Sequence, residues 1–518
     1  MRQVESERKF DIAEGEPLPT LEGIVGVGQA REHRMRAVYV DTVDLLLVRN
    51  RITLRRREGG SDAGWHLKLP RPDGTRLEVH APLTDGPGRY AVPAPLLAEV
   101  AAVLGAAWPT GVEAALLPAA TLTTDRAEID LVDQEGRVVA QLCDDMASAL
   151  PAGRTWRELE VELVGSDNGS DSDSDSDGGS GSDDDELLDR VTEAFEEQGV
   201  ALADSPSKLA RALGDRPERA AAGRGPRRKG PAGDVVLAYL SAQVGGIVGR
   251  EADVRVDAPD AVHKARVATR RLRSALRTFR RLLDRDVTDP LRDEVRWLAT
   301  ALGGPRDAEV MKARILAALD ALPQDQVVGP VRERVATELD RRHADAHQAL
   351  VETLDSDRYR ELLDRLVELL ADPPWRGRAR PSAAKALPDL VRAAVDRVAA
   401  EHAASAATTD EEERLHLLHE TRKRAKAARY ACEALAPSFG ARATDAAVVW
   451  EGVTEALGGL QDSVVATTWL REIAEAAEVA GEPTFTYGRL VGAESAEGER
   501  SRAAGEEAVR EALEHPWP

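Results

Sequence analysis

Between Met35 and Leu163 the chain repeats short segments in which apolar and polar residues alternate, and turn-forming pairs such as Gly59-Gly60 separate these segments. Alternate side chains of a β-strand lie on opposite faces, so this pattern predicts an antiparallel sheet or barrel. The charges on the polar face are sorted by strand, with cations on some segments and carboxylates on others. A sheet with one face in water alternates in the same way, but its solvated face usually mixes the two signs. We therefore expect the apolar faces to pack outward against helices and the polar faces to converge inside a barrel.

The expected lumen has a cationic side and an acidic side. In RITLRRRE the residues Ile52 and Leu54 occupy one face, and the opposite face is almost wholly cationic. The inward cations of the pattern are Arg55, Arg57, Lys68 and Arg126. The inward acids of WRELEVEL are Glu158, Glu160 and Glu162, and within the first ten residues Glu5, Glu7 and Lys9 alternate in the same manner. Arginine binds phosphate oxygens in bidentate fashion and Mg²⁺ prefers carboxylate and phosphate oxygens, so such a lumen suits a linear phosphate chain with a metal ion. The alternative for the N-terminal acids is a polar edge strand.

Length, charge and cysteine content limit the classes of function. With 518 residues the chain exceeds the size of one comfortable core, so two or three domains are expected. The formal net charge of -22 argues against a general attraction to nucleic acid or to an anionic membrane, so any anion site must be local. Cys143 and Cys432 predict neither a disulfide framework nor a zinc site and fit a reducing, cytoplasmic setting. We expect no signal peptide and no run long enough to span a bilayer.

Five segments in a fixed order resemble the CYTH domain of the triphosphate tunnel metalloenzymes over residues 1–214. The segments are ESERK at Glu5, YVDTVDLLLVRNRITLRRR, GWHLKLP, WRELEVEL and SKLARAL. The resemblance implies a closed antiparallel β-barrel tunnel that hydrolyses the terminal phosphate of triphosphate compounds with Mg²⁺ or Mn²⁺, and some members are adenylate cyclases. It implies metal binding by Glu5, Glu7, Glu160 and Glu162, to which strand parity in AQLCDD adds Asp145. It also implies that the triphosphate is held by Lys9, Arg55, Arg57, Lys68, Arg126 and Lys208, with Lys9 near the leaving phosphate.

The sequence departs from the CYTH pattern at two places. Gln141 stands where an inward Glu is expected, so one acceptor has lost its charge, which weakens the case for a second metal ion. The Ser/Asp/Gly tract between about residues 165 and 186 contains no apolar residue and is predicted to be disordered. We interpret the tract as a spacer, the alternative being a calcium sink or a decoy for the basic lumen.

The composition changes after residue 214. Residues 215–233 are rich in Arg, Pro, Gly and Ala and predict a linker. Residues 234–518 are rich in Ala, Leu, Arg and Glu at helical spacing, which predicts an all-α second domain. The predicted fold class is therefore a multidomain α and β protein, with an N-terminal antiparallel β-barrel tunnel flanked by helices and a C-terminal duplicated helical bundle.

Two basic stripes in the helical domain share the same spacing. The first comprises His263, Arg266, Arg270, Arg273 and Arg277, which lie within an arc of roughly 80° of a helix. The second comprises His419, Arg422, Lys426 and Arg429. Matching turns follow at LGGPRDAEV and LGGLQDSVV, with Asp307 and Asp462 in corresponding places. Two copies in the same order predict a duplicated bundle, whereas a single copy would be explained as a solvated basic helix face.

These stripes resemble the CHAD domain over about residues 235–518. The resemblance implies an α-helical scaffold that binds inorganic polyphosphate in a basic groove, lined by His263, Arg266, Arg270, Arg273, His419, Arg422, Lys426 and Arg429. Aromatic residues make up 4% of the chain and do not interleave with these arginines, so no stacking platform for nucleic acid is indicated. Asp307 and Asp462 are interpreted as helix caps or arginine partners rather than metal ligands.

The sequence thus predicts a cytoplasmic, metal-dependent triphosphatase that acts on inorganic triphosphate or a related compound, with Glu5, Glu7 and Lys9 at the reaction centre. A helical domain would bind inorganic polyphosphate, and neither a membrane nor nucleic acid is an expected partner. Two alternatives stay open: an adenylate cyclase that uses the same tunnel, and a polyphosphate-binding protein whose tunnel has lost activity.

Overall fold

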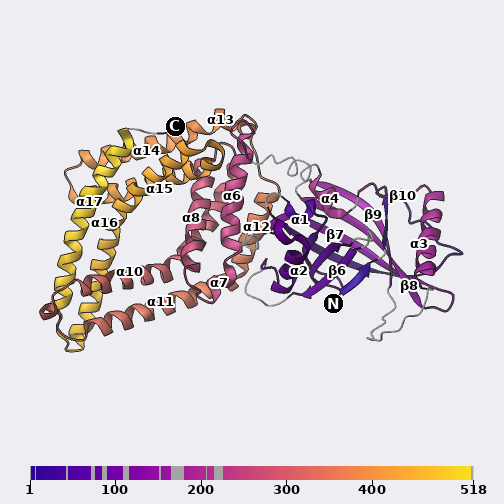
Figure 1. The fold of residues 1–518 in the computed structure, drawn as a ribbon, viewed down its shortest axis with the longest axis horizontal. Coiled ribbons are helices and arrows are strands. Elements are labelled where there is room, and N and C mark those ends of the chain that lie inside the picture. The colour runs from indigo at the N-terminus through magenta and orange to yellow at the C-terminus, as the bar shows by residue number, and fades with distance from the viewer. Residues whose placement is uncertain are drawn as a thin grey trace. The chain divides into compact units, whose positions relative to one another are not determined.

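The computed structural model describes residues 2–5, 7–42, 45–71, 76–83, 90–108, 116–150, 153–164, 180–205, 207–214, 226–514 and 517, without the side chains of 2–5 and 180–185. The chain divides into two compact units. The first comprises Met1–Arg224 together with Val367–Asp372, and the second comprises Gly225–Leu366 together with Pro373–Pro518. The first unit contains a β-sheet with helices beside it, and the second is helical (Figure 1).

Within the described residues, the first unit is built on one ten-stranded antiparallel sheet with the order β1-β6-β5-β4-β3-β7-β8-β9-β2-β10. Its strands are β1 (Arg2–Glu5), β2 (Glu7–Ile12), β3 (Gly26–Asp41), β4 (Thr53–Glu58), β5 (Gly64–Pro70), β6 (Arg76–Pro82), β7 (Leu117–Val132), β8 (Val138–Leu150), β9 (Arg154–Leu163) and β10 (Ala201–Leu202). Its helices are α1 (Leu46–Arg49), α2 (Ala94–Leu104), η1 (Gly105–Ala107), α3 (Ser180–Glu197) and α4 (Lys208–Leu213).

The strands at the two ends of the sheet are joined by a very short connection in the sequence. β1 pairs with β6 at one end, and β2 pairs with β9 near the other end. Only Ser6 separates β1 from β2 in the sequence, and consecutive Cα atoms are about 3.8 Å apart. The sheet therefore curls until its ends lie side by side, which gives it a concave inner face, as the tunnel prediction requires.

Apolar side chains of the outer face pack under two helices. Phe10, Leu159 and Val161 from β2 and β9 are fully buried against Leu188 and Phe195 of α3. Elsewhere on the same outer face, the apolar residues of β4, β5 and β6 form a cluster with α2. They include Leu54, Trp65, Leu67, Leu69 and Val79. Burial of this outer face forces the alternate polar residues inward, so the predicted parity of these strands is confirmed.

The short helix α4 covers one end of the inner face. Ser207 caps it by accepting a hydrogen bond from the backbone N–H of Ala210. Leu209 and Leu213 pack with Tyr39 on β3 and with neighbouring apolar residues of β7 and β8. Tyr39 lies opposite Arg55 in the register and therefore belongs to the inner face, which brings the first residue of α4, Lys208, to the lumen.

The second unit is composed of helices. In chain order they are α6 (Ala232–Val248), α7 (Glu251–Arg255), α8 (Ala261–Thr278), α9 (Arg285–Ala301), α10 (Gly303–Asp320), η3 (Gln324–Gln326), α11 (Val331–Asp355), α12 (Asp357–Ala371), η4 (Gly377–Ala379), α13 (Ala383–Ala386), α14 (Pro388–Ala407), α15 (Glu411–Phe439), α16 (Ala441–Val479) and α17 (Phe485–Glu514). The motif helices α8 and α15 pack against each other. Another core, shared by α10, α11, α16 and α17, contains Ile315, Leu339, Leu470 and Leu490.

One helical stretch of the described residues, Ala232–Arg255, is long and apolar enough to cross a membrane by length and composition, contrary to the sequence expectation. Its apolar window is 61% buried inside the protein. Val236, Leu240 and Val244 of α6 are fully buried, and α6 packs on α8. The apolar run therefore supplies core residues to the helical unit.

Two local predictions differ from the structure. Helix α3 begins at Ser180, so residues 180–186 of the tract expected to be disordered are helical, and residues 165–179 lie outside the described part. Acidic residues in a first turn stabilise a helix through its dipole, which explains the early start. The segment LGGPRDAEV does mark a break between α9 and α10, but LGGLQDSVV lies inside the 39-residue helix α16 and makes no turn.

Candidate functional site

The strand register brings the predicted tunnel residues together on the inner face. Glu7 lies opposite Glu162, and Lys9 lies opposite Glu160. On the next pair of strands Gln141 lies opposite Glu162. The remaining inward pairs are Arg126 with Asp145 and Asp145 with Glu158. The side chain of Glu5 lies outside the described residues, so its predicted metal role stays a prediction.

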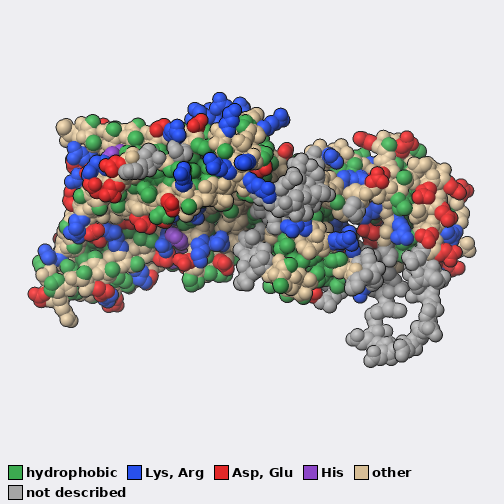
Figure 2. Space-filling view, turned by 45° about the horizontal axis from the view of Figure 1, so that its top comes forward, with side chains coloured by type: hydrophobic (Ala, Val, Ile, Leu, Met, Phe, Trp, Pro, Cys, Tyr) green, Lys and Arg blue, Asp and Glu red, His purple; other side chains and the backbone are tan. Residues whose placement is uncertain are grey.

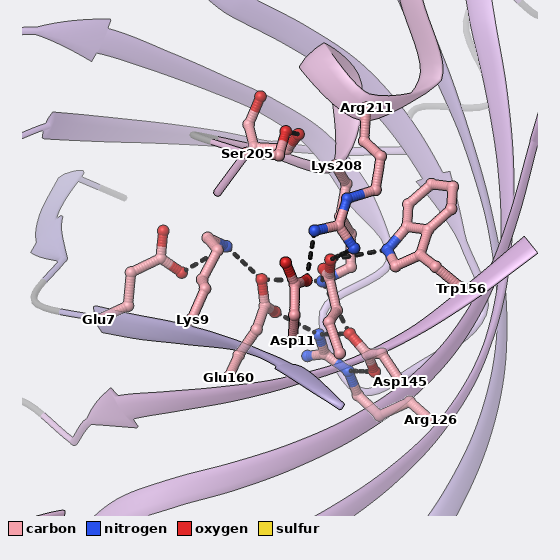
Figure 3. Close-up of polar contacts among 12 residues, drawn as sticks. Glu7, Lys9, Asp11, Arg126, Asp145, Trp156, Glu160, Ser205, Lys208 and Arg211 are labelled. Atoms are coloured by element: carbon pink, nitrogen blue, oxygen red, sulfur yellow. Dashed lines mark hydrogen bonds and ion pairs between the residues drawn. The ribbon is translucent and has the colours of Figure 1, made fainter. Parts of the chain in front are cut away.

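A chain of ion pairs runs through the lumen from Lys9 (Figure 3). The Lys9 ammonium donates to Glu7 Oε2 at 3.0 Å and also to Glu160 Oε1. Burial lowers the pKa of Lys9, but the carboxylates of Glu160 and Glu7 outweigh burial and raise it. Lys9 is therefore fixed as a cation between two acids from β2 and β9.

Lys208 occupies the centre of the acidic side. Its ammonium lies 2.8 Å from carboxylate oxygens of Asp145, Glu158 and Glu160. Burial raises the pKa of Glu160, yet the ammonium groups of Lys208 and Lys9 lower it well below its ordinary value. Burial also raises the pKa of Asp145, but the charges of Lys208 and Arg126 outweigh burial and lower it. Asp145 and Glu160 are thus charged at neutral pH and pair with the ammonium of Lys208.

Arg126 belongs to the same network rather than to an open anion site. Its Nε and Nη2 donate to the two oxygens of Asp145 at 2.7 Å, and Nη2 also donates to Glu160 Oε2 at 2.8 Å. Asp145 is fully buried. The oxygens of Asp145 and Glu160 accept hydrogen bonds from these cations, and the predicted role of both acids as metal ligands stays a prediction. Lys208 and Arg126 pair with these carboxylates, and their predicted binding of substrate stays a prediction.

Two further acids of the inner face, Glu7 and Glu162, lie opposite each other on β2 and β9. Burial raises the pKa of Glu162, and the nearby carboxylates of Glu7 and Glu160 act in the same direction. Such crowding of carboxylates is relieved by a hard divalent cation, which takes oxygen ligands. Gln141 on β8 adds an amide oxygen opposite Glu162 and donates its N–H to Asp130 at 3.1 Å. No group of three metal-ligating side chains is preassembled among the described side chains.

The opposite wall of the lumen is cationic. Arg57 is buried, it pairs with Asp62, and its Nε has no hydrogen-bond partner among the described residues. Burial, together with the charges of Arg55 and Arg126, lowers the pKa of Arg57 to about 9. Burial also lowers the pKa of the adjacent His66 to about 4, although Glu78 accepts a hydrogen bond from its ring. A guanidinium in such surroundings is stabilised by an incoming anion.

Sequence reasoning missed three residues of this site. Arg211 pairs with Asp11 and lies 3.4 Å from Glu158 Oε2. Trp156 donates its indole N–H to the same Glu158 oxygen at 2.7 Å. Arg211 follows Lys208 by three positions in SKLARAL, a spacing that places both side chains on one face of a helix. That spacing was the available indication for Arg211. Strand parity was the available indication for Asp11, which continues the alternation of Glu7 and Lys9, and for Trp156, which has the parity of Glu158.

In the helical unit both basic stripes open into one cavity of about 750 Å³. Of the predicted residues, the cavity is lined by Arg266, Arg270, Arg273, His419, Arg422 and Lys426. It also contains Arg292 and Arg296 from α9, which the sequence reasoning did not include. Arg270 Nη2 donates to Tyr430 Oη at 3.1 Å, which ties α8 to α15 at the floor of the cavity.

Two predicted groove residues do not line this cavity. His263 lines a separate cavity of about 450 Å³ beside Arg306 and His343. Arg429 is held by Glu433 at 2.8 Å and by Glu451 at 2.5 Å. The sequence could have indicated Glu433, which lies four residues after Arg429 on the same helix. It could not reveal Glu451, which lies on the next helix.

The cations in the cavity are crowded. Burial lowers the pKa of Lys426 to about 6, and Arg422, Arg270 and Arg266 lower it further against the opposing effect of Asp462. Burial also lowers the pKa of Arg422. Asp307 accepts a hydrogen bond from Arg266 Nη1 at 2.6 Å. This contact agrees with the interpretation of Asp307 as an arginine partner.

Comparisons with known proteins define the class of this chain. The CYTH domain family matches residues 3–173, and the CHAD domain family matches residues 238–471. The chain therefore belongs to the family of proteins in which a CYTH domain, the fold of the metal-using triphosphate tunnel enzymes, precedes a CHAD domain. The Mycobacterium tuberculosis proteins Rv2226 and MT2285 are each 37% identical to it over 531 residues, covering 98% of this chain and 96% of the relative.

Solved structures resemble part of the chain. PptA from Streptomyces chartreusis is 23% identical, with a TM-score of 0.47, and covers 54% of this chain and 99% of its own. The CHAD domain from the plant Ricinus communis is 25% identical, with a TM-score of 0.45, and covers 56% of this chain and 94% of its own. The family assignment rests on the domain matches and on the full-length relatives.

Proposed function

We propose that the first unit hydrolyses inorganic triphosphate or a related triphosphate compound in a metal-dependent reaction. The observation that carries this proposal is Arg57, a buried guanidinium whose Nε lacks a partner among the described residues and whose neighbours Arg55 and Arg126 are also cations. A lumen with such a wall favours a compact polyanion over a neutral or cationic substrate. The crowded carboxylates of Glu7 and Glu162 on the facing strands favour a divalent cation, Mg²⁺ or Mn²⁺.

In this mechanism the protein mainly positions the phosphate chain and neutralises its negative charge. Arg55, Arg57 and Lys68 bind oxygens of the phosphate chain, which lowers the charge that opposes attack by water. Lys9, held between Glu7 and Glu160, donates a hydrogen bond toward the phosphoryl group as negative charge develops on it. Glu7 and Glu162, with Glu5, would hold the metal ion, which when bound neutralises phosphate oxygens and acidifies water.

The second unit, in our proposal, binds inorganic polyphosphate. The supporting observation is Lys426, which lines a cavity of about 750 Å³. Burial and the surrounding arginines lower the pKa of Lys426 to about 6. A polyanion in that cavity would restore the charge of Lys426 and relieve repulsion among Arg266, Arg270 and Arg422. A phosphate polymer needs only charge and extended shape from its site, and both motif helices supply them.

The test is phosphate release from inorganic triphosphate with Mg²⁺ or Mn²⁺. The intact protein is compared with Glu7→Gln and with Glu135→Gln, a matched change in an exposed turn. We expect release that depends on the metal, falls by a factor of about 10² or more in Glu7→Gln, and is unchanged in Glu135→Gln. Absence of release from the intact protein, with cyclic AMP formed from ATP, would replace the triphosphatase by a cyclase. Absence of both activities, with polyphosphate still bound, would mean a binding protein.

A further inference from the structure

The basic cavity of the helical unit continues past the end of its first motif helix. A second cavity of about 660 Å³ is lined by Arg280, Arg281, Arg285, Arg376 and Arg378, with Leu283 and Gly377 between them. Arg280 lines both cavities, so the two adjoin at this residue. No acidic side chain is among the described residues that line the second cavity. On the face drawn in Figure 2, Lys and Arg side chains gather along the upper edge of the helical unit, where Figure 1 places α13.

The arginines of the second cavity stand on a rigid support. The link between α8 and α9 pairs with the segment before η4 through an antiparallel bridge between Leu283 and Trp375. The backbone N–H of Asp284 donates to Pro374 O at 2.8 Å, and that of Arg376 donates to Leu282 O at 2.8 Å. Leu282 and Leu283 are buried beneath this ladder. Arginines from two distant parts of the sequence are thereby held around one cavity.

The charge of this cavity is poorly compensated within the protein. Arg376 is 3.0 Å from Asp284, and Arg285 is 3.5 Å from Asp289. Arg280, Arg281 and Arg378 form no hydrogen bond or ion pair with any described residue. Burial lowers the pKa of Arg397 on α14, and Arg280, Arg424 and Arg281 lower it further. Repulsion therefore extends from the motif cavity into the second one.

The duplicated half of the domain does not repeat this feature. The spacing that relates His263 to His419 and Arg270 to Lys426 places Glu433 where the first copy has Arg277. It places Ala436 and Pro437 where the first copy has Arg280 and Arg281. The cationic surface thus extends beyond the motif helix in the first copy but not in the second, so the two ends of the groove differ in charge.

We propose that a long polyphosphate chain leaves the motif cavity past Arg280 and binds a second segment in the cavity of Arg281 and Arg378, which short chains do not reach. This inference rests on the proposed binding of polyphosphate by the motif cavity. Its consequence is an affinity that depends on chain length and comes from two separable parts of the groove.

The test is equilibrium binding of triphosphate, of chains of intermediate length and of long-chain polyphosphate to the full chain at several salt concentrations. One variant, Arg281→Ala with Arg378→Ala, removes two exposed arginines of the second cavity. A charge-matched control, Arg442→Ala with Arg471→Ala, removes two exposed arginines of α16 that line neither cavity. A third variant, Arg270→Ala with Lys426→Ala, disrupts the motif cavity.

We expect the second-cavity variant to bind long chains about tenfold more weakly, with a logarithmic salt slope smaller by roughly 0.7 for each lost contact, and to bind short chains unchanged. The control should match the intact protein at every length. Equal binding of long chains by the second-cavity variant and its control would overturn the inference, as would an equal loss for short chains. If the motif variant lost no affinity for any length, the proposed polyphosphate groove itself would fail.

Discussion

Gly458 of α16 lies directly under the guanidinium of Arg422 on α15. A Cβ atom built at Gly458 would stand 2.8 Å from Arg422 Nη2, closer than real contacts allow. Arg422 Nε donates to Thr454 O at 3.2 Å, one helical turn before Gly458, so the side chain is laid across the helix surface. In the first copy Gly303 stands similarly near Arg266, whose Nη2 would be 4.0 Å from an added Cβ. Gly458 therefore leaves room for Arg422, whereas a methyl group at Gly303 would only touch Arg266.

The change Gly458→Ala should weaken polyphosphate binding without unfolding the protein. The added methyl group displaces Arg422 from the cavity, and we expect affinity to fall by about tenfold, the loss of one or two charge-assisted hydrogen bonds. Calorimetric titration with polyphosphate measures this fall in affinity. Gly452→Ala on the same helix is the control, because nothing lies within 4 Å of its Cβ. It should leave affinity unchanged and stabilise the helix by about 0.5–1 kcal/mol.

Binding of polyphosphate should take up protons near neutral pH. Lys426, with its pKa lowered to about 6 by burial and by Arg422, is mostly neutral at pH 7 and must gain a proton when a polyanion enters. The bound pKa is therefore higher than the free one, so affinity is greatest below about pH 6 and falls as pH rises above it, by at most a factor of ten per pH unit. Burial also lowers the pKa of His419, which adds to the dependence in the same direction.

Titrations in buffers of different ionisation enthalpy measure this proton uptake. Lys426→Arg keeps a permanent charge and should flatten the decline between pH 6 and 8, leaving the contribution of His419. Equal proton uptake in the intact protein and in Lys426→Arg would contradict the assignment to Lys426.

Lys208→Met should destabilise the first unit more than any exposed substitution. Asp145, Glu158 and Glu160 would lose their shared cation, and breaking a buried charge set of this kind costs about 3–5 kcal/mol. The pKa values of Asp145 and Glu160 are lowered in the fold, so their contribution is present above the unfolded pKa of about 4 and is lost as pH falls through the folded values.

The destabilisation by Lys208→Met should accordingly be largest near pH 7 and shrink in acid. Urea unfolding at pH 7 and at pH 4 measures it, with Arg190→Met on the exposed face of α3 as the control. The same loss of stability at both pH values would show that Lys208 acts through packing rather than charge.

Glu162→Gln should stabilise the protein in the absence of metal and weaken its binding of metal. The change removes a half-buried carboxylate whose pKa is raised by burial and by Glu7, so the repulsion between β2 and β9 falls. Thermal unfolding with and without Mn²⁺ measures both effects: we expect a higher Tm without metal and a smaller rise of Tm on addition of Mn²⁺. An unchanged response to Mn²⁺ would place the metal away from Glu162.

The faces of the strands were predictable because a strand has a period of two. Leu159 and Val161 are fully buried under α3, and Glu158 and Glu160 lie on the other face as the alternation predicts. The partners of those acids were not predictable, because register sets them. Asp145 lies beside Arg126 in the register and 2.8 Å from the ammonium of Lys208, which is far away in the sequence, so its own strand pattern did not reveal either partner.

In the helical unit the basic stripes were visible from helical spacing, and Arg270, Arg422 and Lys426 do line one cavity. The pair Gly458-Gly459 predicts a turn from local propensity, but helix α16 continues through it, with Arg422 and Ser501 packed close to the two glycines. The contributions of Arg292 and Arg296 depended on how α9 packs against α8, which no local pattern records.

The position of α4 has a practical consequence for dividing this protein. The match to the CYTH family ends at residue 173, but β10, which pairs with β2, and Lys208 both follow it. A fragment cut at the family boundary would lack the α3 side chains that cover Phe10 and Leu159, and its lumen would keep three buried acids without their ammonium. An autonomous N-terminal domain must therefore reach Gly214, so the boundary for expressing it is set by an ion-pair network rather than by sequence similarity.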